Sequence, residues 1–369
     1  MSERWAPLMR RAFELAEGGR YGASPNPMVG AVLVSSQGRV IGEGAHLRCG
    51  GPHAEVVALA AAREPVRGGT LVVNLEPCAH SGRTGPCVDA LIASGLARVV
   101  IGGRDPNPQV GGRGVAALRA AGIEVIEGVE AAACERLNRR FLHWMRTGMP
   151  FVTLKMAMTL DGKLAARGGR SRWITGEASR RAGYALREEF DAILIGAGTA
   201  RADNPRLRRH LGLNPNPGIM RVVLDPGLSL PTGSVLLSED AEDVVLFHCG
   251  RAPADRLREL AAGPVSLVEV ADDGDGRCSL REVLRWLGGH LISSVLVEGG
   301  GEVHWSFLAE GLAQEVHAFV APLVLGGREA TLAVAGLGFA SPQDGVRLHF
   351  DEIRRLDEDL VIVAGVEHV

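Results

Sequence analysis

The feature that most constrains the fold is an alternation of short apolar runs with helical stretches along the whole chain of 369 residues. The runs Thr70–Leu75 (TLVVNL) and Ala97–Ile101 are strand-like, whereas His53–Arg63 has apolar residues at helical spacing. Ala131–Arg146 is predicted to form one closing helix. Alternation of this kind indicates α/β layers, in which helices cover a sheet.

A domain boundary is predicted near residues 147–150, because Gly148 can end a helix and Pro150 cannot continue one. A second alternation of strand-like runs and helices begins directly after it. The length of the chain also exceeds what one hydrophobic core usually serves. We therefore predict two domains, residues 1–148 and residues 149–369.

Composition excludes several classes of function. Hydrophobic residues make up 46% of the chain and the net charge is −3, so no general affinity for nucleic acid or for anionic membranes is expected. No apolar run reaches the roughly 20 residues that a membrane span needs. The opening segment has the pattern of an amphipathic helix and lacks an apolar signal core. We therefore expect a cytoplasmic protein that binds neither nucleic acid nor membrane.

Three short segments in the first half carry residue types that bind metal. They are His53–Glu55 (HAE), Glu76–Cys78 (EPC) and Gly85–Cys87 (GPC). In a reducing compartment, two cysteines near a histidine favour a metal over a disulfide. One imidazole and two thiolates can hold Zn²⁺ tetrahedrally and leave the fourth position to water. We therefore predict His53, Cys78 and Cys87 as zinc ligands.

Glu55 lies two residues after His53, in the H-x-E arrangement that, together with P-C-x-x-C, is typical of zinc deaminases. Here the second cysteine follows the first by nine positions, so the interval is wider. Glu55 would move a proton from the activated water to a ring nitrogen and then to the leaving ammonia. The alternative is a structural zinc site, for which His80 could supply a fourth ligand.

The second half contains no complete glycine motif for a dinucleotide. Gly299–Gly301 follows a strand-like run and precedes a helix, so its backbone amides could approach a phosphate. Gly196–Thr199 also follows a strand, but the third glycine is absent, and no acidic residue stands about 20 positions after Gly299–Gly301. The residues alone predict a phosphate-binding α/β domain rather than a Rossmann fold, with a simple tight turn as the alternative.

Three segments of the first half read PNPMVG (Pro25–Gly30), EPCAHSGRTGPC (Glu76–Cys87) and DPNP (Asp105–Pro108). They resemble the bifunctional deaminase-reductases of riboflavin biosynthesis, whose first two patterns are P-N-P-x-V-G and E-P-C-x-H-x-G-[KR]-T-P-P-C. The long loop between the cysteines favours this family over plain cytidine deaminases. The resemblance implies that Asn26 hydrogen-bonds the substrate pyrimidine and that His80 lines its pocket. The alternative for Asn26 is a turn residue between two prolines.

The second half resembles the reductase half of the same family, in segments that keep the family's order: Lys155–Lys163, Ser171–Thr175, Thr199–Leu207 and Val297–Gly300. The resemblance implies a cytidine-deaminase-like α/β/α domain followed by a dihydrofolate-reductase-like α/β domain, with Zn²⁺ and NADPH as cofactors. It implies cofactor contacts at Ala157, Trp173, Thr199, Asp203, Gly300 and Gly301. It implies substrate contacts at Lys155, Ser171, Arg187, Leu207, His210 and Glu298.

One departure from the family pattern concerns the substrate phosphate. The family usually has L-T-V-R where this chain has L-R-R-H, so His210 stands at the usual arginine position. The phosphate contact could instead lie at Arg206, Arg208 or Arg209, or it could be weaker than in the family. Arg187 suits a phosphate because a guanidinium binds oxyanions through two parallel hydrogen bonds.

The resemblance implies two reactions in series. The amino group of a diaminopyrimidine that carries a phosphoribosylamino group is replaced by oxygen, and NADPH then reduces the ribosyl group to ribityl. The resemblance also implies a small-molecule substrate and a homo-oligomer, because the family's reductase half commonly assembles through its sheet edge. Two other interpretations remain: a nucleic-acid base deaminase, which the acidic net charge disfavours, and a structural zinc module joined to a nucleotide sensor.

Overall fold

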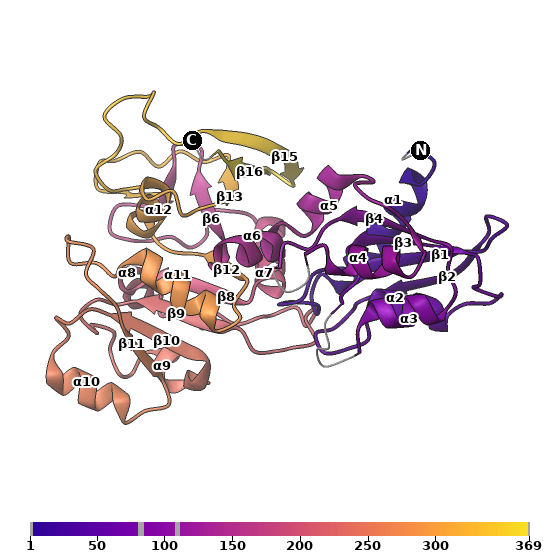
Figure 1. The fold of residues 1–369 in the computed structure, drawn as a ribbon. Helices are drawn as coiled ribbons and strands as arrows, with labels where there is room; N and C mark the ends of the chain where they lie inside the picture. The colour runs from indigo at the N-terminus through magenta and orange to yellow at the C-terminus, as the bar shows by residue number, and fades with distance from the viewer. Residues whose placement is uncertain (1–2, 80–84, 108–110, 368–369) are drawn as a thin grey trace. The chain divides into compact units, whose positions relative to one another are not determined.

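The structure is a computed structural model that describes residues 3–79, 85–107 and 111–367. It divides into two compact units, Met1–Gly148 and Met149–Val369 (Figure 1). Within the described residues, the helices are too short or too polar to pass through a lipid bilayer.

The first unit is an α/β unit. Its strands are β1 (Gly30–Val34), β2 (Val40–Ala45), β3 (Thr70–Leu75), β4 (Arg98–Gly103) and β5 (Glu124–Ile126). Its helices are α1 (Ala6–Ala16), α2 (Ala54–Ala60), α3 (Cys87–Ala93), α4 (Arg113–Ala120), α5 (Ala131–Leu137) and α6 (Arg139–Thr147), with a 3-10 turn at Glu17–Gly19. The sheet has the order β2-β1-β3-β4-β5, with β1 antiparallel to β2 and β3 and with β3, β4 and β5 parallel.

Helices cover both faces of this sheet, because successive strand residues point to opposite sides. On one face, Leu33 and Val73 pack in a core with residues of α2, α3 and α4. On the other face, Val32 and Val72 pack with residues of α1. This arrangement confirms the predicted α/β/α layers.

The prediction of one closing helix over Ala131–Arg146 is wrong, because the structure has two helices that meet at Asn138. Asn138 has φ −105° and ψ 18°, outside the helical region. Its side-chain oxygen accepts the N–H of Met28 at 2.8 Å, and its amide nitrogen donates to the Met28 carbonyl at 3.0 Å. The break therefore coincides with a side chain that is bonded to a distant loop, which periodicity along the chain does not reveal.

The second unit is a larger α/β unit. Its strands are β6 (Phe151–Thr159), β7 (Lys163–Ala165), β8 (Ala192–Gly196), β9 (Met220–Leu224), β10 (Val244–His248), β11 (Ser266–Glu269), β12 (Ser294–Val297), β13 (Glu315–Ala321), β14 (Thr331–Leu332), β15 (Leu348–Leu356) and β16 (Asp359–Val366). Its helices are α7 (Glu177–Glu189), α8 (Ala197–Asp203), α9 (Val235–Ser238), α10 (Ala254–Ala261), α11 (Leu280–Gly289) and α12 (Gly301–Ala309), with a 3-10 turn at Ala241–Asp243.

The main sheet of this unit has the order β11-β10-β9-β8-β12-β6-β13-β16-β15. The strands from β11 to β13 are parallel, and β16 and β15 complete the sheet in antiparallel pairing. One core contains residues of α11 and α12, and the cores on the opposite face contain residues of α7, α8, α9 and α10. Because β8 and β12 are parallel neighbours, the loops after them lie at the same sheet edge, where open parallel sheets bind ligands.

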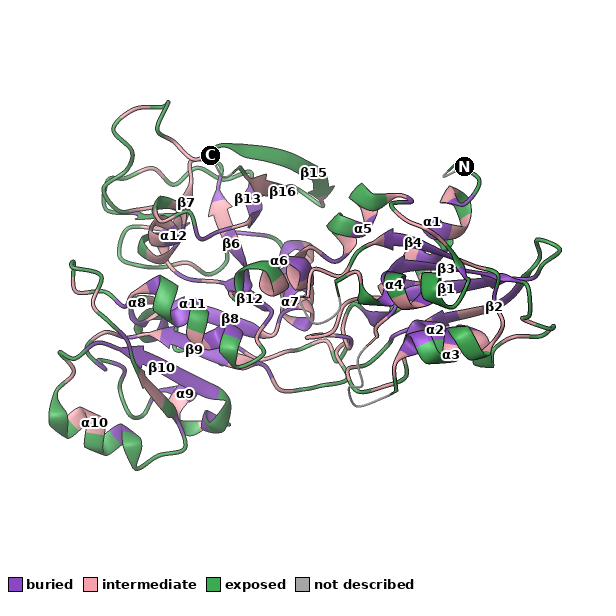
Figure 2. Ribbon diagram, viewed as in Figure 1, coloured by how far each residue is buried: buried purple, intermediate pink, exposed green. Residues whose placement is uncertain are grey.

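Strand β15 was not predicted, and Figure 2 shows it as exposed along its length. Its sequence, LHFDEIRRL, mixes apolar and charged side chains and contains no continuous apolar run. Leu348, Phe350 and Ile353 are exposed on this edge strand. A strand without a buried face lacks the signal on which the other predictions were based.

Candidate active sites

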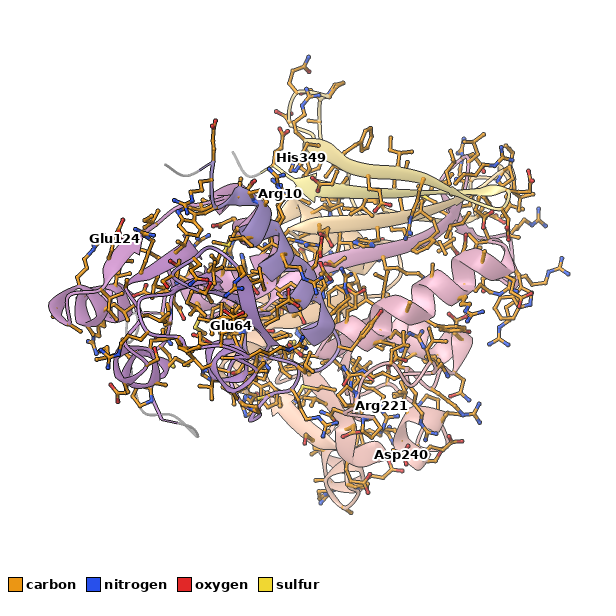
Figure 3. The ribbon with its side chains drawn as sticks, turned by 90° about the vertical axis from the view of Figure 1, so that its right-hand side faces the viewer. Arg10, Glu64, Glu124, Arg221, Asp240 and His349 are labelled. Atoms are coloured by element: carbon orange, nitrogen blue, oxygen red, sulfur yellow. The ribbon has the colours of Figure 1, made fainter. Side chains whose placement is uncertain are left out.

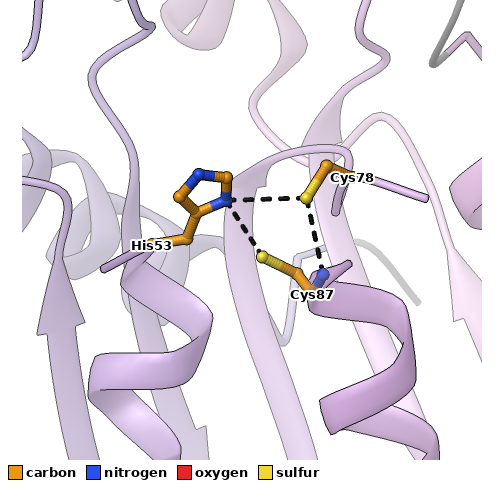
Figure 4. Close-up of side chains that lie close together, drawn as sticks. All are labelled: His53, Cys78 and Cys87. Atoms are coloured by element: carbon orange, nitrogen blue, oxygen red, sulfur yellow. Dashed lines mark hydrogen bonds between the residues drawn. The ribbon is translucent and has the colours of Figure 1, made fainter. Parts of the chain in front are cut away.

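The three predicted metal ligands come together at the amino-terminal ends of two helices (Figure 4). His53 is the residue before α2, Cys78 follows β3, and Cys87 is the first residue of α3. The Nδ1 atom of His53 lies 3.1 Å from Cys87 Sγ and 3.5 Å from Cys78 Sγ. All three ligand atoms lie within 4.8 Å of one another.

The geometry fits a zinc ion. Tetrahedral zinc, with bonds of about 2.0 Å to nitrogen and about 2.3 Å to sulfur, separates the two atoms by roughly 3.6 Å. The nitrogen–sulfur distances of 3.1 and 3.5 Å are close to that value. Within the described part of the chain, no fourth histidine, cysteine or carboxylate belongs to the cluster. His80, the candidate fourth ligand and pocket residue, lies outside the described residues.

The two thiols influence each other strongly. The hydrogen bond with Cys87, together with His53, lowers the pKa of the Cys78 thiol to about 4. The same thiol pairing and burial raise the pKa of Cys87. One thiolate is therefore favoured and a second is opposed, unless a cation stabilises both. A divalent ion would remove this conflict, because it stabilises every thiolate that coordinates it.

Glu55 is buried in the first turn of α2, two residues after His53. Burial raises the pKa of its carboxyl, which also hydrogen-bonds with Cys87. The helix thus carries a metal-ligand candidate at its start and a carboxyl within its first turn. This places a buried carboxyl against the cluster.

Asn26 is linked to the same region through His46, a residue that the sequence analysis missed. His46 Nδ1 lies 3.0 Å from the Pro52 carbonyl, which can only accept, so this nitrogen carries the proton. Its Nε2 then accepts the amide N–H of Asn26 at 3.1 Å. Burial lowers the pKa of His46, in keeping with a neutral ring. The ring also lies edge-on to His53, with centroids 5.3 Å apart.

The loop that carries Asn26 is held by two buried asparagines. Asn74 on β3 accepts the N–H of Gly30 at 2.8 Å and donates to the Met28 carbonyl at 2.9 Å. Asn138 holds both backbone groups of Met28 from the other side. These bonds satisfy polar groups that burial would otherwise leave unpaired, and they fix the loop. No sequence motif predicted that Asn74 and Asn138 would hold this loop.

The second unit has a pocket of about 590 Å³ at the ends of β8 and β12, with α7 and α12 contributing to its wall. The predicted cofactor contacts that line it are Ala157, Trp173, Thr199, Asp203, Gly300 and Gly301. The predicted substrate contacts that line it are Lys155, Ser171, Arg187 and Glu298. Residues from distant motifs are thus gathered in one pocket.

A part-buried ion-pair network lies in this pocket. Arg187 of α7 contacts Glu298 with Nε at 2.6 Å and Nη2 at 3.0 Å, and Lys155 Nζ of β6 lies 3.9 Å from the same carboxylate. Burial alone would raise the pKa of Glu298, but Arg187 and then Lys155 bring it down to about 2. The carboxylate is therefore ionised throughout the neutral range.

The glycine turn after β12 brings the amino-terminal end of α12 into the pocket wall. A side chain on Gly301 would lie 2.4 Å from the Leu332 carbonyl oxygen, and one on Gly299 would lie 2.9 Å from Val303. Glycine is therefore required by packing within the turn. The positive end of the helix dipole at this turn fits a cofactor phosphate.

Comparisons with known proteins cover both units. Residues 3–103 match the cytidine and deoxycytidylate deaminase zinc-binding region, and residues 150–362 match the RibD C-terminal domain. The riboflavin biosynthesis protein RibD of Bacillus amyloliquefaciens is 41% identical over 96% of this chain and 95% of its own length. The RibD protein of Aquifex aeolicus is 39% identical, with 96% of each chain covered. The chain belongs to the RibD family.

Solved structures of RibD proteins agree with this assignment. Acinetobacter baumannii RibD superposes with a TM-score of 0.89 at 36% identity over 100% of both chains. A deaminase/reductase of Thermotoga maritima superposes with a TM-score of 0.84 at 37% identity over 99% of both chains. The predicted family is confirmed, as is the fold class of a deaminase-like unit followed by a RibD-type reductase unit.

Two predicted contacts of the RibD-family reductase are not part of the pocket lining. The Leu207 side chain is 3% exposed and belongs to a hydrophobic core, and its backbone has a φ of 49°. His210 lies edge-on to Tyr184 with ring centroids 4.8 Å apart. Tyr184 does line the pocket, so His210 is one residue removed from it.

The three arginines considered for the phosphate already have partners. Arg206 and Arg208 form ion pairs with Glu239, and Arg208 also pairs with Asp240. Arg209 donates to four backbone carbonyls, those of residues 187, 190, 216 and 218. Arg209 therefore holds the loop to the end of α7 rather than facing the pocket.

Two buried charges fix the same loop. Glu188 accepts the N–H groups of His210, Leu211 and Asn214 at 2.8 to 3.1 Å. Arg221, fully buried on β9, donates to the carbonyls of residues 206, 239 and 240, and Figure 3 labels it with Asp240. The segment of residues 206–214 is thus held by Glu188 and Arg221, two side chains that the sequence motifs do not include.

Proposed function

We propose that residues 1–148 of this chain catalyse a hydrolytic deamination and that residues 149–369 catalyse an NADPH-dependent reduction, as consecutive steps of riboflavin biosynthesis. The first step converts 2,5-diamino-6-(5-phosphoribosylamino)pyrimidin-4(3H)-one to 5-amino-6-(5-phosphoribosylamino)uracil and ammonia. The second reduces the ribosyl group to ribityl. Membership of the RibD family supports both activities, and the Thermotoga maritima relative carries both in its name.

In the deaminase unit, His53, Cys78 and Cys87 would hold zinc. Bound zinc supplies the Lewis acidity that makes water a nucleophile near neutral pH. Glu55 takes one proton from the attacking water and passes it to the ring nitrogen, and it then carries the proton of the new C–OH group to the leaving amino group. A carbon–oxygen bond forms, a carbon–nitrogen bond breaks, and ammonia departs. Asn26 hydrogen-bonds the pyrimidine, and His46 holds its amide in orientation.

The observation that carries the deaminase assignment is the convergence of one ring nitrogen and two sulfurs beside a buried carboxyl. The test is Glu55→Gln, with the exposed Glu14→Gln as a control for the loss of one charge. Glu55→Gln is expected to retain bound zinc and to lose ammonia release by roughly a hundredfold or more. Ammonia release at the wild-type rate with zinc bound would refute the role of Glu55.

In the reductase unit, Trp173, Thr199, Asp203 and the Gly300–Gly301 turn would hold NADPH. The cofactor supplies a hydride for C1 of the sugar. As the bond between C1 and the ring oxygen opens, that oxygen takes a proton, for which the Lys155 ammonium is the candidate donor. Glu298 holds Lys155 and Arg187 in the pocket.

The order of the two steps can be followed in one assay. Purified protein with the diaminopyrimidine substrate is expected to release ammonia without NADPH and to consume NADPH only afterwards. The aminouracil product, supplied directly, should support NADPH consumption at once. NADPH consumption from the diaminopyrimidine before any ammonia appears would contradict the proposed order.

We also propose a homo-oligomer in a reducing compartment, the cytoplasm. The exposed apolar side chains Leu348, Phe350 and Ile353 on the outermost strand support a contact with a second copy, because an open strand edge readily pairs with another. The six cysteines are all free thiols, as expected in that compartment. Light scattering should give a mass above that of one chain, and Phe350→Glu should lower it.

A further inference from the structure

The reductase pocket has three basic side chains of lysine or arginine among the described residues that line it: Lys155, Arg180 and Arg187. Two of them face a single carboxylate, because Arg187 contacts Glu298 through two nitrogens and Lys155 approaches it to 3.9 Å. Arg187 also donates to the Arg208 carbonyl at 3.3 Å. All three guanidinium nitrogens of Arg187 therefore already have hydrogen-bond partners within the protein.

Arg180 is held in a different way. Its guanidinium carbon lies 4.5 Å from the centre of the Trp173 ring, and its Nη1 donates to the Thr175 carbonyl at 2.8 Å. Among the described residues, no carboxylate lies within the 4.0 Å of an ion pair with it, and this includes the pocket residues Asp203 and Glu302. Neutral partners thus fix the orientation of Arg180 while its charge stays unbalanced.

On α7, Arg180 lies between two predicted contacts: its ring partner Trp173 is predicted to contact the cofactor, and Arg187, on the same helix face, is predicted to contact the substrate. Arg180, Gly183, Tyr184 and Arg187 all line the pocket and follow one another at the spacing of a single helix face. Arg187 is a predicted substrate contact on that face. A phosphate on the substrate would bring two negative charges into a pocket where the other cations are already paired.

We infer that Arg180 binds a phosphate group in the reductase pocket, an inference that rests on the proposed reductase activity. Its ligand chemistry is that of a phosphate ester, which a guanidinium recognises through charge-assisted hydrogen bonds. Two sources carry this chemistry, the 5-phosphate of the substrate and the phosphates of NADPH. Because α12 presents its amino-terminal end at the cofactor side, the substrate phosphate is the expected partner.

The test compares Arg180→Ala with Arg181→Ala in the full chain. Arg181 is the next residue of α7, is exposed, and does not line the pocket, so its variant loses the same charge elsewhere. For Arg180→Ala the KM for phosphorylated aminouracil should rise roughly ten- to a hundredfold, as expected for loss of a hydrogen bond to a charged group. The kcat and the KM for NADPH should change little, and ribose 5-phosphate should inhibit this variant more weakly.

A second substrate separates phosphate binding from a structural role. With the dephosphorylated substrate, wild type and Arg180→Ala should have the same KM, whereas a structural defect would penalise both substrates. A rise in the KM for NADPH alone would assign the phosphate to the cofactor. Unchanged values for both KM would overturn the inference. Wild-type protein that cannot reduce the aminouracil at all would instead refute the proposed reductase function, and reduction of the dephosphorylated substrate by each variant reports that its reductase unit is folded.

Discussion

The cluster of candidate metal ligands in the first unit and the pocket of the second unit bring their reactive groups together in different ways. In the first unit, His53, Cys78 and Cys87 come from the ends of neighbouring elements in one stretch of chain. In the second, Arg187 and Glu298 are 111 positions apart and meet at the end of a parallel sheet. The first cluster gathers donors that oppose one another without a cation, and the second gathers charges that already balance.

This difference teaches how each activity should respond to change. A zinc-binding site depends on an ion that the chain must acquire. A site built from its own ion pairs is preformed, and it is sensitive to the loss of any one partner. Perturbations should therefore separate the two activities of the same chain cleanly.

Removal of metal should have the largest effect. Treatment with a strong chelator is expected to lower ammonia release more than about a thousandfold, since zinc brings the pKa of water from about 15.7 to near 7. Reduction of supplied aminouracil should stay within twofold of the untreated protein. Added zinc should restore ammonia release. A parallel loss of both activities would break the comparison, because it would make the metal a requirement of the whole chain.

Glu298→Gln should be the strongest change in the second unit. It leaves the part-buried Arg187 without its charge partner, and removal of one member of a buried pair costs up to about 3–5 kcal/mol of stability. Aminouracil reduction should fall by roughly a hundredfold or more through loss of a pair that holds Lys155. Ammonia release should remain. A matched control is Glu329→Gln, whose ion-pair partner and own side chain are exposed.

The same variant makes a prediction about pH. The pKa of Glu298 falls from its ordinary value of 4.5 to about 2 in the folded chain, so its ionised form stabilises the fold. That contribution is fully present above pH 4.5 and is lost as the pH falls through the range down to about 2. Thermal unfolding of wild type and Glu298→Gln should therefore differ most near neutral pH and converge in acid. A difference that grows in acid would contradict the assignment.

Asn138→Ala should have a moderate effect that is confined to the first activity. It removes both side-chain bonds to Met28, and the KM for the diaminopyrimidine should rise about tenfold, by loss of roughly one to two hydrogen bonds. Asn138→Asp keeps an acceptor for the Met28 N–H and should fall between wild type and Asn138→Ala. Zinc content and aminouracil reduction should be unchanged. An equal decline of zinc content would show that Asn138 supports the whole unit instead.

Most strands and the candidate metal ligands were predictable from local sequence. The features that could not be predicted have physical reasons in common. Strand Thr70–Leu75 was placed correctly because its six residues are all buried and four of them are apolar. The cluster of His53, Cys78 and Cys87 was found because its ligands lie at element ends within short motifs. Asn138 and His46 were missed because their roles come from bonds to residues 110 and 20 positions away. Leu207 was assigned to the substrate by resemblance, whereas its side chain belongs to the core.

Gly183→Ala should produce the smallest effect. It is informative because the stability of the fold and the reductase activity should change in opposite directions. Alanine in a helix interior is favoured over glycine by up to about 1 kcal/mol. Its Cβ would lie 3.4 Å from Lys155 Cε and 3.7 Å from Nζ, so it would contact the side chain that lies beside Glu298 and limit the movement of the ammonium. The reductase kcat should fall a few-fold while the melting temperature holds or rises.

The control for that change is Gly289→Ala at the end of α11, where an added Cβ meets no atom within 4 Å. It should gain helix stability without altering aminouracil reduction. If both variants slow reduction equally, helix rigidity rather than the Lys155 position sets the rate. If only Gly183→Ala slows reduction, glycine is needed in α7 to leave room for Lys155 beside Glu298. The activity of the pocket would then be more sensitive to an added methyl group than the stability of the fold is.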